Sequence, residues 1–272
     1  MRLDLHLHTT ASDGAWSPEA VVEGAAAGGL DVIAITDHDT TAAVAAARSA
    51  AAGLALEVIA GVELSTTYEG RDVGILGYFV DVTAAPLVEA GRRAERRREE
   101  RMREMIDRLA EQGVEVPFEA VERAAGEDAV VIGRPHLAAA LVESDHATSV
   151  SDAFDRLIGD DHPAFVPTHL LEPAEAVEIV LASGGIPVWA HPPGDLVDPL
   201  LPGLKRAGLR GLEVYRPRHR KSEVLRLEAI CRSSGLLMTG GSDWHSPGGG
   251  AALGDFWVDS DEVEGFLTAG GM

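Results

Sequence analysis

Short apolar runs alternate with segments of helical period along most of the chain. The apolar runs predict seven strands, at residues 2–8, 31–36, 56–61, 72–80, 186–190, 211–215 and 236–240. The segments between them predict helices at 17–28, before residue 52, and at 173–183, 200–207, 222–233 and 261–267. Because strands and helices alternate, we expect parallel β/α units that share one sheet.

The pattern changes between residues 84 and 165, where helical period replaces the strand–helix rhythm. A long helix is predicted at 92–112, with eight arginines and one apolar stripe, and shorter helices at 118–125, 134–142 and 151–157. Most of the arginines alternate with glutamates, which favours a solvated, salt-bridged face; a minority could face a phosphate-bearing ligand. We therefore expect a helical insertion at 84–165 over the mouth of a barrel formed by 1–83 and 166–272.

Histidines and carboxylates follow the predicted strands at their carboxyl ends. His6 and His8 are two residues apart, so on a strand both imidazoles face the same side, and Asp13 follows after a short turn. The full set is His6, His8, Asp13, His38, Glu63, His191, Asp243 and His245. Each residue alone could be a helix cap, a surface acid or part of a turn. Eight of them at the same edge of one sheet favour a polynuclear metal site.

Composition limits the kind of site and the kind of partner. The 272-residue chain has a net charge of −21, which repels polyanions at long range, so we expect no duplex DNA partner. Cys231 is the only cysteine, which excludes an internal disulfide and a zinc site built from thiolates. Mixed nitrogen and oxygen ligands suit Mn, Fe or Zn. We expect no signal peptide and no membrane span, and hence a cytoplasmic protein.

The strand-end residues occur in motifs that resemble the PHP (polymerase and histidinol phosphatase) family of metal-dependent phosphoesterases. These motifs are DLHLHTTASDG (4–14), ITDHDT (35–40), GVELS (61–65), AHP (190–192) and GSDWH (241–245). Arg134-Pro135-His136 and the segment from Glu213 to His219 resemble the branch with nucleoside 3′,5′-bisphosphate phosphatases and 5′→3′ exoribonucleases. The resemblance implies an α/β fold, a distorted (β/α)7 barrel that holds up to three metals.

The resemblance also implies a distribution of the ligands. His6, His8, Glu63 and Asp243 would hold one metal, Asp13, His38 and His245 would hold a second, and Glu63 with His191 would hold a third. The family normally has a histidine where this chain has Gly74, and glycine offers no ligand. Because a catalytic metal normally has at least three protein ligands, we expect two divalent ions, with the third site weak, empty or dependent on substrate phosphate.

The function implied is hydrolysis of a phosphate ester by hydroxide bound to the metals, since we find no nucleophilic Ser or Cys motif. The expected substrate is a small nucleotide, such as a 3′,5′-bisphosphonucleoside, or a 5′-phosphorylated RNA end. Arg134 would bind phosphate, and His136 and His219 would bind phosphate or protonate the leaving group, although each could be structural. Two alternatives are a phosphatase for a metabolite such as histidinol phosphate and a metal-binding module that has lost catalysis. His146, His162 and His169 are expected to have no role, and the oligomeric state is left open.

Overall fold

The computed structural model describes residues 1–167, 171–217, 219–247 and 252–272, so His169 lies outside the described residues. Its central element is an eight-stranded sheet in the order β7-β6-β5-β4-β3-β2-β1-β8. The strands are β1 (Arg2–Leu7), β2 (Val32–Ile35), β3 (Glu57–Tyr68), β4 (Arg71–Tyr78), β5 (Ile186–Trp189), β6 (Gly211–Tyr215), β7 (Leu237–Gly240) and β8 (Val258–Asp259). The seven predicted strands are therefore present, with one short strand added at the edge.

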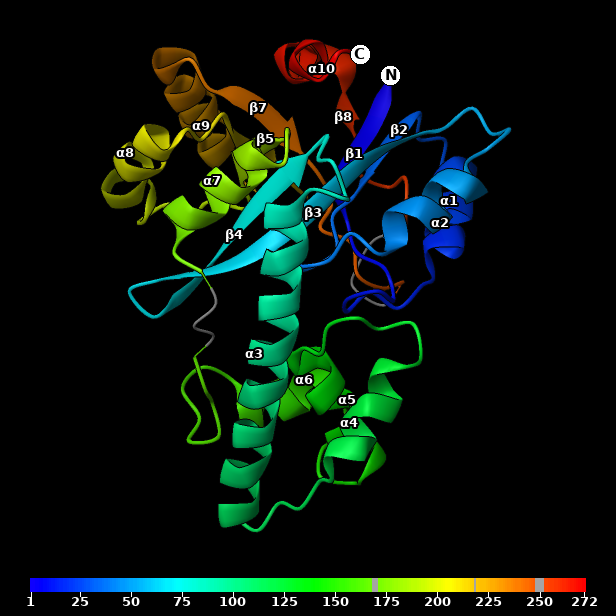
Figure 1. Ribbon diagram of the computed structural model, residues 1–272, viewed down its shortest axis with the longest axis vertical. Coiled ribbons are helices and arrows are strands. Elements are labelled where there is room, and N and C mark those ends of the chain that lie inside the picture. The colour runs from blue at the N-terminus through cyan, green and yellow to red at the C-terminus, as the bar shows by residue number, and fades with distance from the viewer. Residues whose placement is uncertain (168–170, 218, 248–251) are drawn as a thin grey trace.

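The sheet curls until its two ends approach each other, as Figure 1 shows. A parallel bridge joins Leu7, at the end of β1, to Trp244, which follows β7. Asp243 donates its backbone N–H to the carbonyl of His6 at 2.9 Å, which brings the same two segments together. The nearly closed, barrel-shaped sheet with its helices confirms the predicted α/β barrel. Its closure places the carboxyl ends of β1 and β7 beside each other.

Two parts of the sheet depart from the parallel pattern, and the smaller one is the edge strand β8, which pairs antiparallel with β1. β3 and β4 form a hairpin, and β4 also pairs antiparallel with β5. The hairpin turn is Glu69-Gly70, and both residues have positive φ, as a two-residue turn of type I′ requires. The prediction that a strand ends at residue 61 and that Glu63 follows it is wrong, because β3 continues to Tyr68 and Glu63 pairs with Leu76 inside it. The polar residues after Glu63 hide this extension in the sequence.

Helices cover the outside of the sheet. They are α1 (Pro18–Ala27), α2 (Ala43–Ala50), α7 (Pro173–Ala182), α8 (Val197–Ala207), α9 (Lys221–Ser234), the short 3-10 helix η2 (Ser260–Glu262) and α10 (Glu264–Gly270). Ser17 caps α1 by accepting a hydrogen bond from the N–H of Ala20, as the sequence predicts. Leu5, Ile33 and Ile75 are fully buried in the sheet, and each such side chain contributes about 1.5–3 kcal/mol by its burial.

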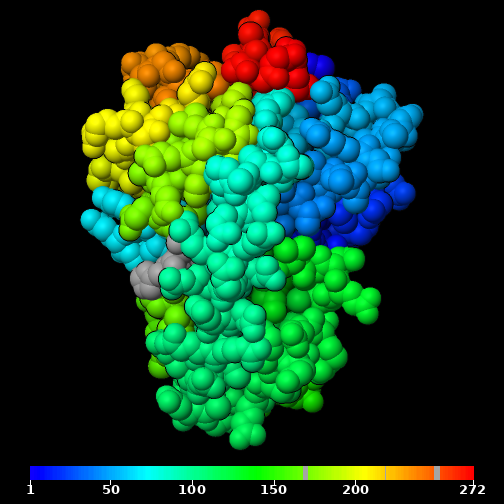
Figure 2. All heavy atoms as spheres, in the orientation of Figure 1, coloured from blue at the N-terminus to red at the C-terminus, as the bar shows by residue number. Residues whose placement is uncertain are grey.

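A second group of helices packs around its own hydrophobic cluster. It comprises α3 (Ala85–Glu111), α4 (Phe118–Ala125), α5 (Arg134–Glu143), α6 (Val150–Ala153) and the π-helical turn η1 (Phe154–Ile158). The prediction that the long helix begins at residue 92 is wrong, because α3 begins at Ala85, with Pro86 in its first turn. Figures 1 and 2 show α3 running from the barrel into this second group.

The apolar stripe of α3 is buried where the sequence places it. Met102, Met105 and Leu109 are each at most 1% exposed and belong to the cluster of the second group. The opposite face carries exposed ion pairs one helical turn apart, such as Glu99 with Arg103. In the part of the chain that the structure describes, no helix is long and apolar enough to cross a membrane.

Candidate metal centre

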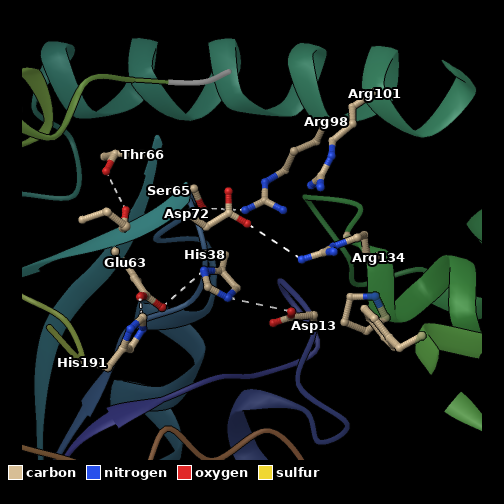
Figure 3. Close-up of a pocket in the computed structure, with 15 residues that line it drawn as sticks. Asp13, His38, Glu63, Ser65, Thr66, Asp72, Arg98, Arg101, Arg134 and His191 are labelled. Atoms are coloured by element: carbon tan, nitrogen blue, oxygen red, sulfur yellow. Dashed lines mark hydrogen bonds and ion pairs between the residues drawn. The ribbon is translucent and has the colours of Figure 1, made fainter. Parts of the chain in front are cut away.

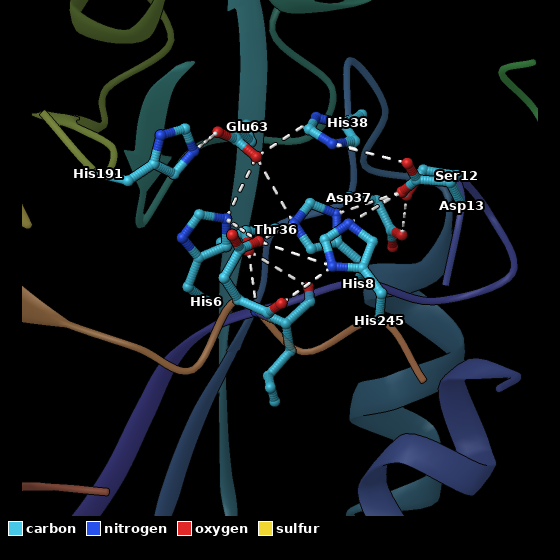
Figure 4. A network of polar contacts seen from close by, with 12 residues as sticks. His6, His8, Ser12, Asp13, Thr36, Asp37, His38, Glu63, His191 and His245 are labelled. Atoms are coloured by element: carbon cyan, nitrogen blue, oxygen red, sulfur yellow. Dashed lines mark hydrogen bonds and ion pairs between the residues drawn. The ribbon is translucent and has the colours of Figure 1, made fainter. Parts of the chain in front are cut away.

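β1 brings two imidazoles to the mouth of the barrel. Nε2 of His6 lies 3.2 Å from Oε2 of Glu63 and 3.4 Å from Oδ1 of Asp243. Nε2 of His8 lies 3.5 Å and 3.3 Å from the same two oxygens. Both imidazoles are completely buried. Glu63 comes from β3 and Asp243 from the segment after β7, so three separate parts of the chain converge on one point (Figure 4).

A second group of ligand atoms shares His8 with the first. Asp13 follows β1, His38 follows β2, and His245 follows β7. The carboxylate of Asp13 lies 3.8 Å from His8, 3.8 Å from His38 and 3.4 Å from His245. The rings of His8 and His245 stack at 4.0 Å between centroids. The structure therefore brings together seven of the eight residues that the sequence singles out, in two groups that could each hold an ion.

The donor atoms in these groups fit divalent metals. Both ring nitrogens of His8 and Nδ1 of His38 are buried without a hydrogen-bond partner, which is unfavourable unless something else binds them. Ligand atoms bound at about 2.1 Å to one ion lie about 3.0–3.4 Å apart, close to the separations found here. Imidazole and carboxylate ligands without thiolate match zinc, manganese or iron.

Charges within the cluster favour the metal-binding protonation states of His8 and Glu63. Against the effect of burial, which lowers it, nearby carboxylates raise the pKa of His6 and of His245, whose extra protons a metal would displace. Burial, together with the neighbouring His245 and His38, lowers the pKa of His8 to about 3, so its imidazole is neutral at neutral pH. Burial alone would raise the pKa of Glu63, but the imidazoles of His38 and His6 hold it well below its usual value. Neutral imidazoles and ionised carboxylates are the forms that coordinate metals.

A fully buried carboxylate accepts hydrogen bonds from two of the histidines that the sequence singles out. Oε1 of Glu213, in β6, lies 2.8 Å from Nδ1 of His6, and Oε2 accepts the backbone N–H of His191 at 2.8 Å. Nδ1 of His6 therefore donates a hydrogen bond to Glu213, which leaves Nε2 as the atom that could bind a metal. Sequence reasoning gives Glu213 no role, although a glutamate in the middle of an apolar strand is a signal that could reveal it.

Strained backbone accompanies the site. Asp39, His191 and Asp243 are non-glycine residues with positive φ, at 56°, 33° and 57°. Such conformations cost of order 1–3 kcal/mol each and persist where the surroundings enforce them. Asp243 is held by Nη2 of Arg216, which donates a hydrogen bond to its Oδ2 at 2.6 Å. Asp39 in turn accepts the N–H of Ser65 at 2.7 Å, so hydrogen bonds hold both strained aspartates in place.

A pocket of about 250 Å³ opens beside the cluster. Figure 3 shows Asp13, His38, Glu63 and His191 on one wall and the guanidinium groups of three arginines on the other. The arginines are Arg98 and Arg101 from α3 and Arg134 from α5. The pocket thus pairs metal-ligand chemistry with concentrated positive charge, in a chain whose net charge is strongly negative.

The three arginines are held differently. Arg98 is 9% exposed; its Nε donates to Oδ2 of Asp39 at 2.8 Å, and its Nη2 to Oγ of Ser65 at 2.6 Å. Nε of Arg101 donates to the carbonyl of Val166 at 2.7 Å, while its Nη2 is buried without a partner. Burial and the like charge of Arg134 lower the pKa of Arg101 to about 10. Of the three side chains, Arg101 is the one with a buried donor that lacks a partner.

The predicted substrate contacts are placed unevenly. Arg134 lines the pocket, with Nη1 donating to Asp160 at 2.5 Å and Nη2 3.8 Å from Asp72. His136 is buried, and its Nδ1 accepts the N–H of Gly133 at the start of α5, so only Nε2 could reach a substrate. Nδ1 of His219 lies 2.9 Å from the carbonyl of Val214. Neither histidine is among the described residues that line the pocket.

Similarity to known proteins agrees with this geometry. The model of the PHP domain family matches residues 4–124. The chain is 35% identical to the 5′-3′ exoribonuclease Rnm of Escherichia coli over 90% of its length and 85% of the relative. It is 36% identical to the phosphoribosyl 1,2-cyclic phosphate 1,2-diphosphodiesterase of Eggerthella lenta, covering 89% of this chain and 93% of that one.

A further relative and a solved structure show the same similarity. Identity is 32% to the 3′,5′-nucleoside bisphosphate phosphatase of Chromobacterium violaceum, over 91% of this chain and 88% of the relative. A crystal structure from Bifidobacterium adolescentis, assigned as a metal-dependent phosphoesterase, aligns with a TM-score of 0.89 and 33% identity over 98% of this chain and 95% of that one. These matches run through both the barrel and the second group of helices. The chain belongs to the PHP domain family of metal-dependent phosphoesterases.

Proposed function

We propose that this protein hydrolyses a phosphate ester of a small nucleotide, or of a 5′-phosphorylated RNA end, with two bound divalent ions. One observation carries the proposal: the pocket beside the ligand cluster is lined by Arg98, Arg101 and Arg134. A phosphate at the metals and further negative charge on the same substrate would both find partners there. Nucleotides and phosphorylated RNA ends combine these features.

The two groups of ligand atoms define the proposed ion sites. His6, His8, Glu63 and Asp243 would bind one ion, and Asp13, His38 and His245, with His8 nearby, would bind the second. Manganese, iron or zinc would supply Lewis acidity and lower the pKa of a bound water. Glu213 would fix the orientation of His6 through their 2.8 Å contact.

The helical segment 84–165 is proposed as an insertion that supplies the cationic wall of the pocket. Arg101 is the best placed anion contact, because its Nη2 lacks a partner. Arg134 would exchange its pairing with the exposed carboxylate of Asp160 for a phosphate, a substitution that keeps its charge neutralised. His136, through Nε2, and His219 remain proposed contacts to phosphate or to the leaving group.

The alternatives fit the pocket less well. Histidinol phosphate carries an amine and an imidazole beside its phosphate, so its cationic end would face three arginines. A metal-binding module that has lost catalysis would keep the ligand cluster but would have no use for the three arginines that line the pocket beside it. A long RNA would approach a chain of net charge −21, which favours a small substrate or a short end. Because these substrates are cytoplasmic, we propose that the protein acts in the cytoplasm.

A substrate panel tests the proposal. Reconstituted protein with added Mn would be assayed for phosphate or nucleotide release from four compounds. They are a 3′,5′-bisphosphonucleoside, a 5′-phosphorylated oligoribonucleotide, a ribose 1,2-cyclic phosphate and histidinol phosphate. The proposal predicts the highest kcat/KM for one of the first two. A preference for histidinol phosphate, or no turnover of any ester by metal-loaded protein, would refute it.

A further inference from the structure

The third ion that the family resemblance implies does not fit this chain. That ion would need Glu63, His191 and a ligand at position 74, where the chain has glycine. A side chain added at Gly74 would overlap Oε1 of Glu63 and come within 3.0 Å of Cβ of Ala190. The carboxylate of Glu63 therefore leans into the space that a ligand at position 74 would occupy.

The two oxygens of Glu63 have different partners. Oε2 lies 3.2 Å from His6, 3.5 Å from His8 and 3.3 Å from Nδ1 of His38, so it faces both proposed ion sites. Oε1 lies 3.0 Å from Nε2 of His191. Figure 4 shows Glu63 between these two sides, with His191 opposite His38. One oxygen faces the ion cluster, and the other is held by a single imidazole.

His191 is not placed as a metal ligand. Among the described residues, it belongs to neither group of converging ligand atoms, and Glu63 is the carboxylate that its ring contacts. A carboxylate accepts hydrogen bonds, so Nε2 of His191 is the donor in the 3.0 Å contact. The residue is fixed through its backbone by Glu213, at 2.8 Å from its N–H, and has a positive φ of 33°. A fixed donor of this kind can orient the carboxylate that it contacts.

We propose that His191 is a positioning residue in a two-ion site: it donates a hydrogen bond to Oε1 of Glu63 and thereby keeps Oε2 directed at the two ions. Gly74 is what permits this arrangement, because any larger residue would displace Oε1. The inference rests on the proposed two-ion function, yet it concerns a residue whose role can be measured separately. It assigns to His191 the role of a hydrogen-bond donor to a metal ligand, in place of the role of a metal ligand itself.

Metal content is the first test, and it needs no turnover. The wild type, His191→Ala and His245→Ala would be loaded with Mn or Zn, desalted and analysed by mass spectrometry for ions per chain. We expect two ions in the wild type, two in His191→Ala and one in His245→Ala, the matched control that removes a proposed ligand. Three ions in the wild type with two in His191→Ala would overturn the inference. A wild type that binds no ion would instead contradict the proposed function.

Rescue by a hydrogen-bond donor is the second test. The side-chain amide of glutamine can donate to Oε1 of Glu63, whereas alanine cannot. We expect His191→Ala to lower kcat by about 10–100-fold with KM nearly unchanged, and His191→Gln to recover most of it. Equal losses in both variants would contradict a positioning role. Melting temperatures of the metal-free variants would show whether each one folds.

A double-mutant cycle links His191 to Gly74. The methyl group of Gly74→Ala would push Oε1 of Glu63 away from His191, so this variant should lose the same interaction. We expect Gly74→Ala combined with His191→Ala to lower kcat no further than the more severe single variant, because contacting residues are not additive. Losses that multiply would show that the two positions act independently and would overturn the inference.

Discussion

Nδ1 of His6 lies 2.8 Å from Oε1 of Glu213, and both side chains are completely buried. Replacing Glu213 with Gln removes the charge that holds this imidazole in the ligand tautomer. Partners of this kind contribute about 10–100-fold to metal affinity. We therefore expect Glu213→Gln to lose Zn or Mn at a chelator concentration about 10–100-fold lower than the wild type requires. Glu228→Gln, on α9 and bonded to Tyr215, is the control and should bind metal like the wild type. Equal affinities for Glu213→Gln and the wild type would contradict the supporting role.

Oδ1 of Asp243 lies close to the imidazoles of both His6 and His8. Asp243→Asn keeps the shape of the side chain and removes the negative charge, so we expect at least a 100-fold loss of kcat/KM and of affinity for one ion. Far-ultraviolet circular dichroism should match that of the wild type. An active Asp243→Asn protein would refute the proposed ligand set.

The unpartnered Nη2 of Arg101 predicts a substrate-binding effect. Arg101→Met should raise KM by about 10–100-fold, the range expected for losing a charge-assisted hydrogen bond of about 1.5–3 kcal/mol, while metal content stays the same. Arg134→Ala should act in the same direction. Arg103→Met removes a cation from the exposed face of α3, where it pairs with Glu99, and serves as the control. If all three variants raise KM equally, KM depends on the net charge of the protein and not on contacts between these arginines and the substrate in the pocket.

Asp4 predicts a dependence of stability on pH. Burial raises the pKa of this carboxyl to about 6, above the value of 3.8 in an unfolded chain. The folded state therefore holds the proton more tightly, and the free energy of unfolding should fall as pH rises from about 4 to about 6. The shift corresponds to about 3 kcal/mol. Because Asp4→Asn cannot ionise, its free energy of unfolding relative to the wild type should increase over this range.

Urea unfolding of metal-free protein measures this difference. The comparison of Asp4→Asn with the wild type at each pH removes contributions that both proteins share. The carbonyl of asparagine can still accept the N–H of Ser242, which Oδ1 of Asp4 accepts at 2.8 Å. A difference between the two proteins that stays constant across the range would show that Asp4 does not carry the effect.

The sequence predicts much of the barrel and of the cluster, for a physical reason. Parallel strands end at one edge of the sheet, so residues after β1, β2, β5 and β7 must lie near one another. The hairpin of β3 and β4 is harder to predict. Ser65, Thr66 and Thr67 interrupt the apolar run, and only pairing with β4 shows that the strand continues. The end of a strand depends on its pairing with a neighbouring strand, and the apolar pattern of a single strand does not show that pairing.

The arginines of α3 that line the pocket cannot be singled out in the sequence, because the helix contains so many arginines. Eight arginines occur between residues 92 and 108, and helical period shows which of them share a face but not which face meets the barrel. The structure selects Arg98 and Arg101, because α3 leans across the mouth of the pocket there (Figure 3). The same limit applies to Glu213, whose role depends on the residue it faces across the sheet.

An anomalous-scattering map of crystals grown with Mn or Zn tests the central claim most directly. Two peaks are predicted, one within about 2.0–2.2 Å of ligand atoms from His6, His8, Glu63 and Asp243, and one equally close to Asp13, His38 and His245. No peak should lie between Glu63 and His191. A metal-replete crystal with no ion at the cluster would contradict the account.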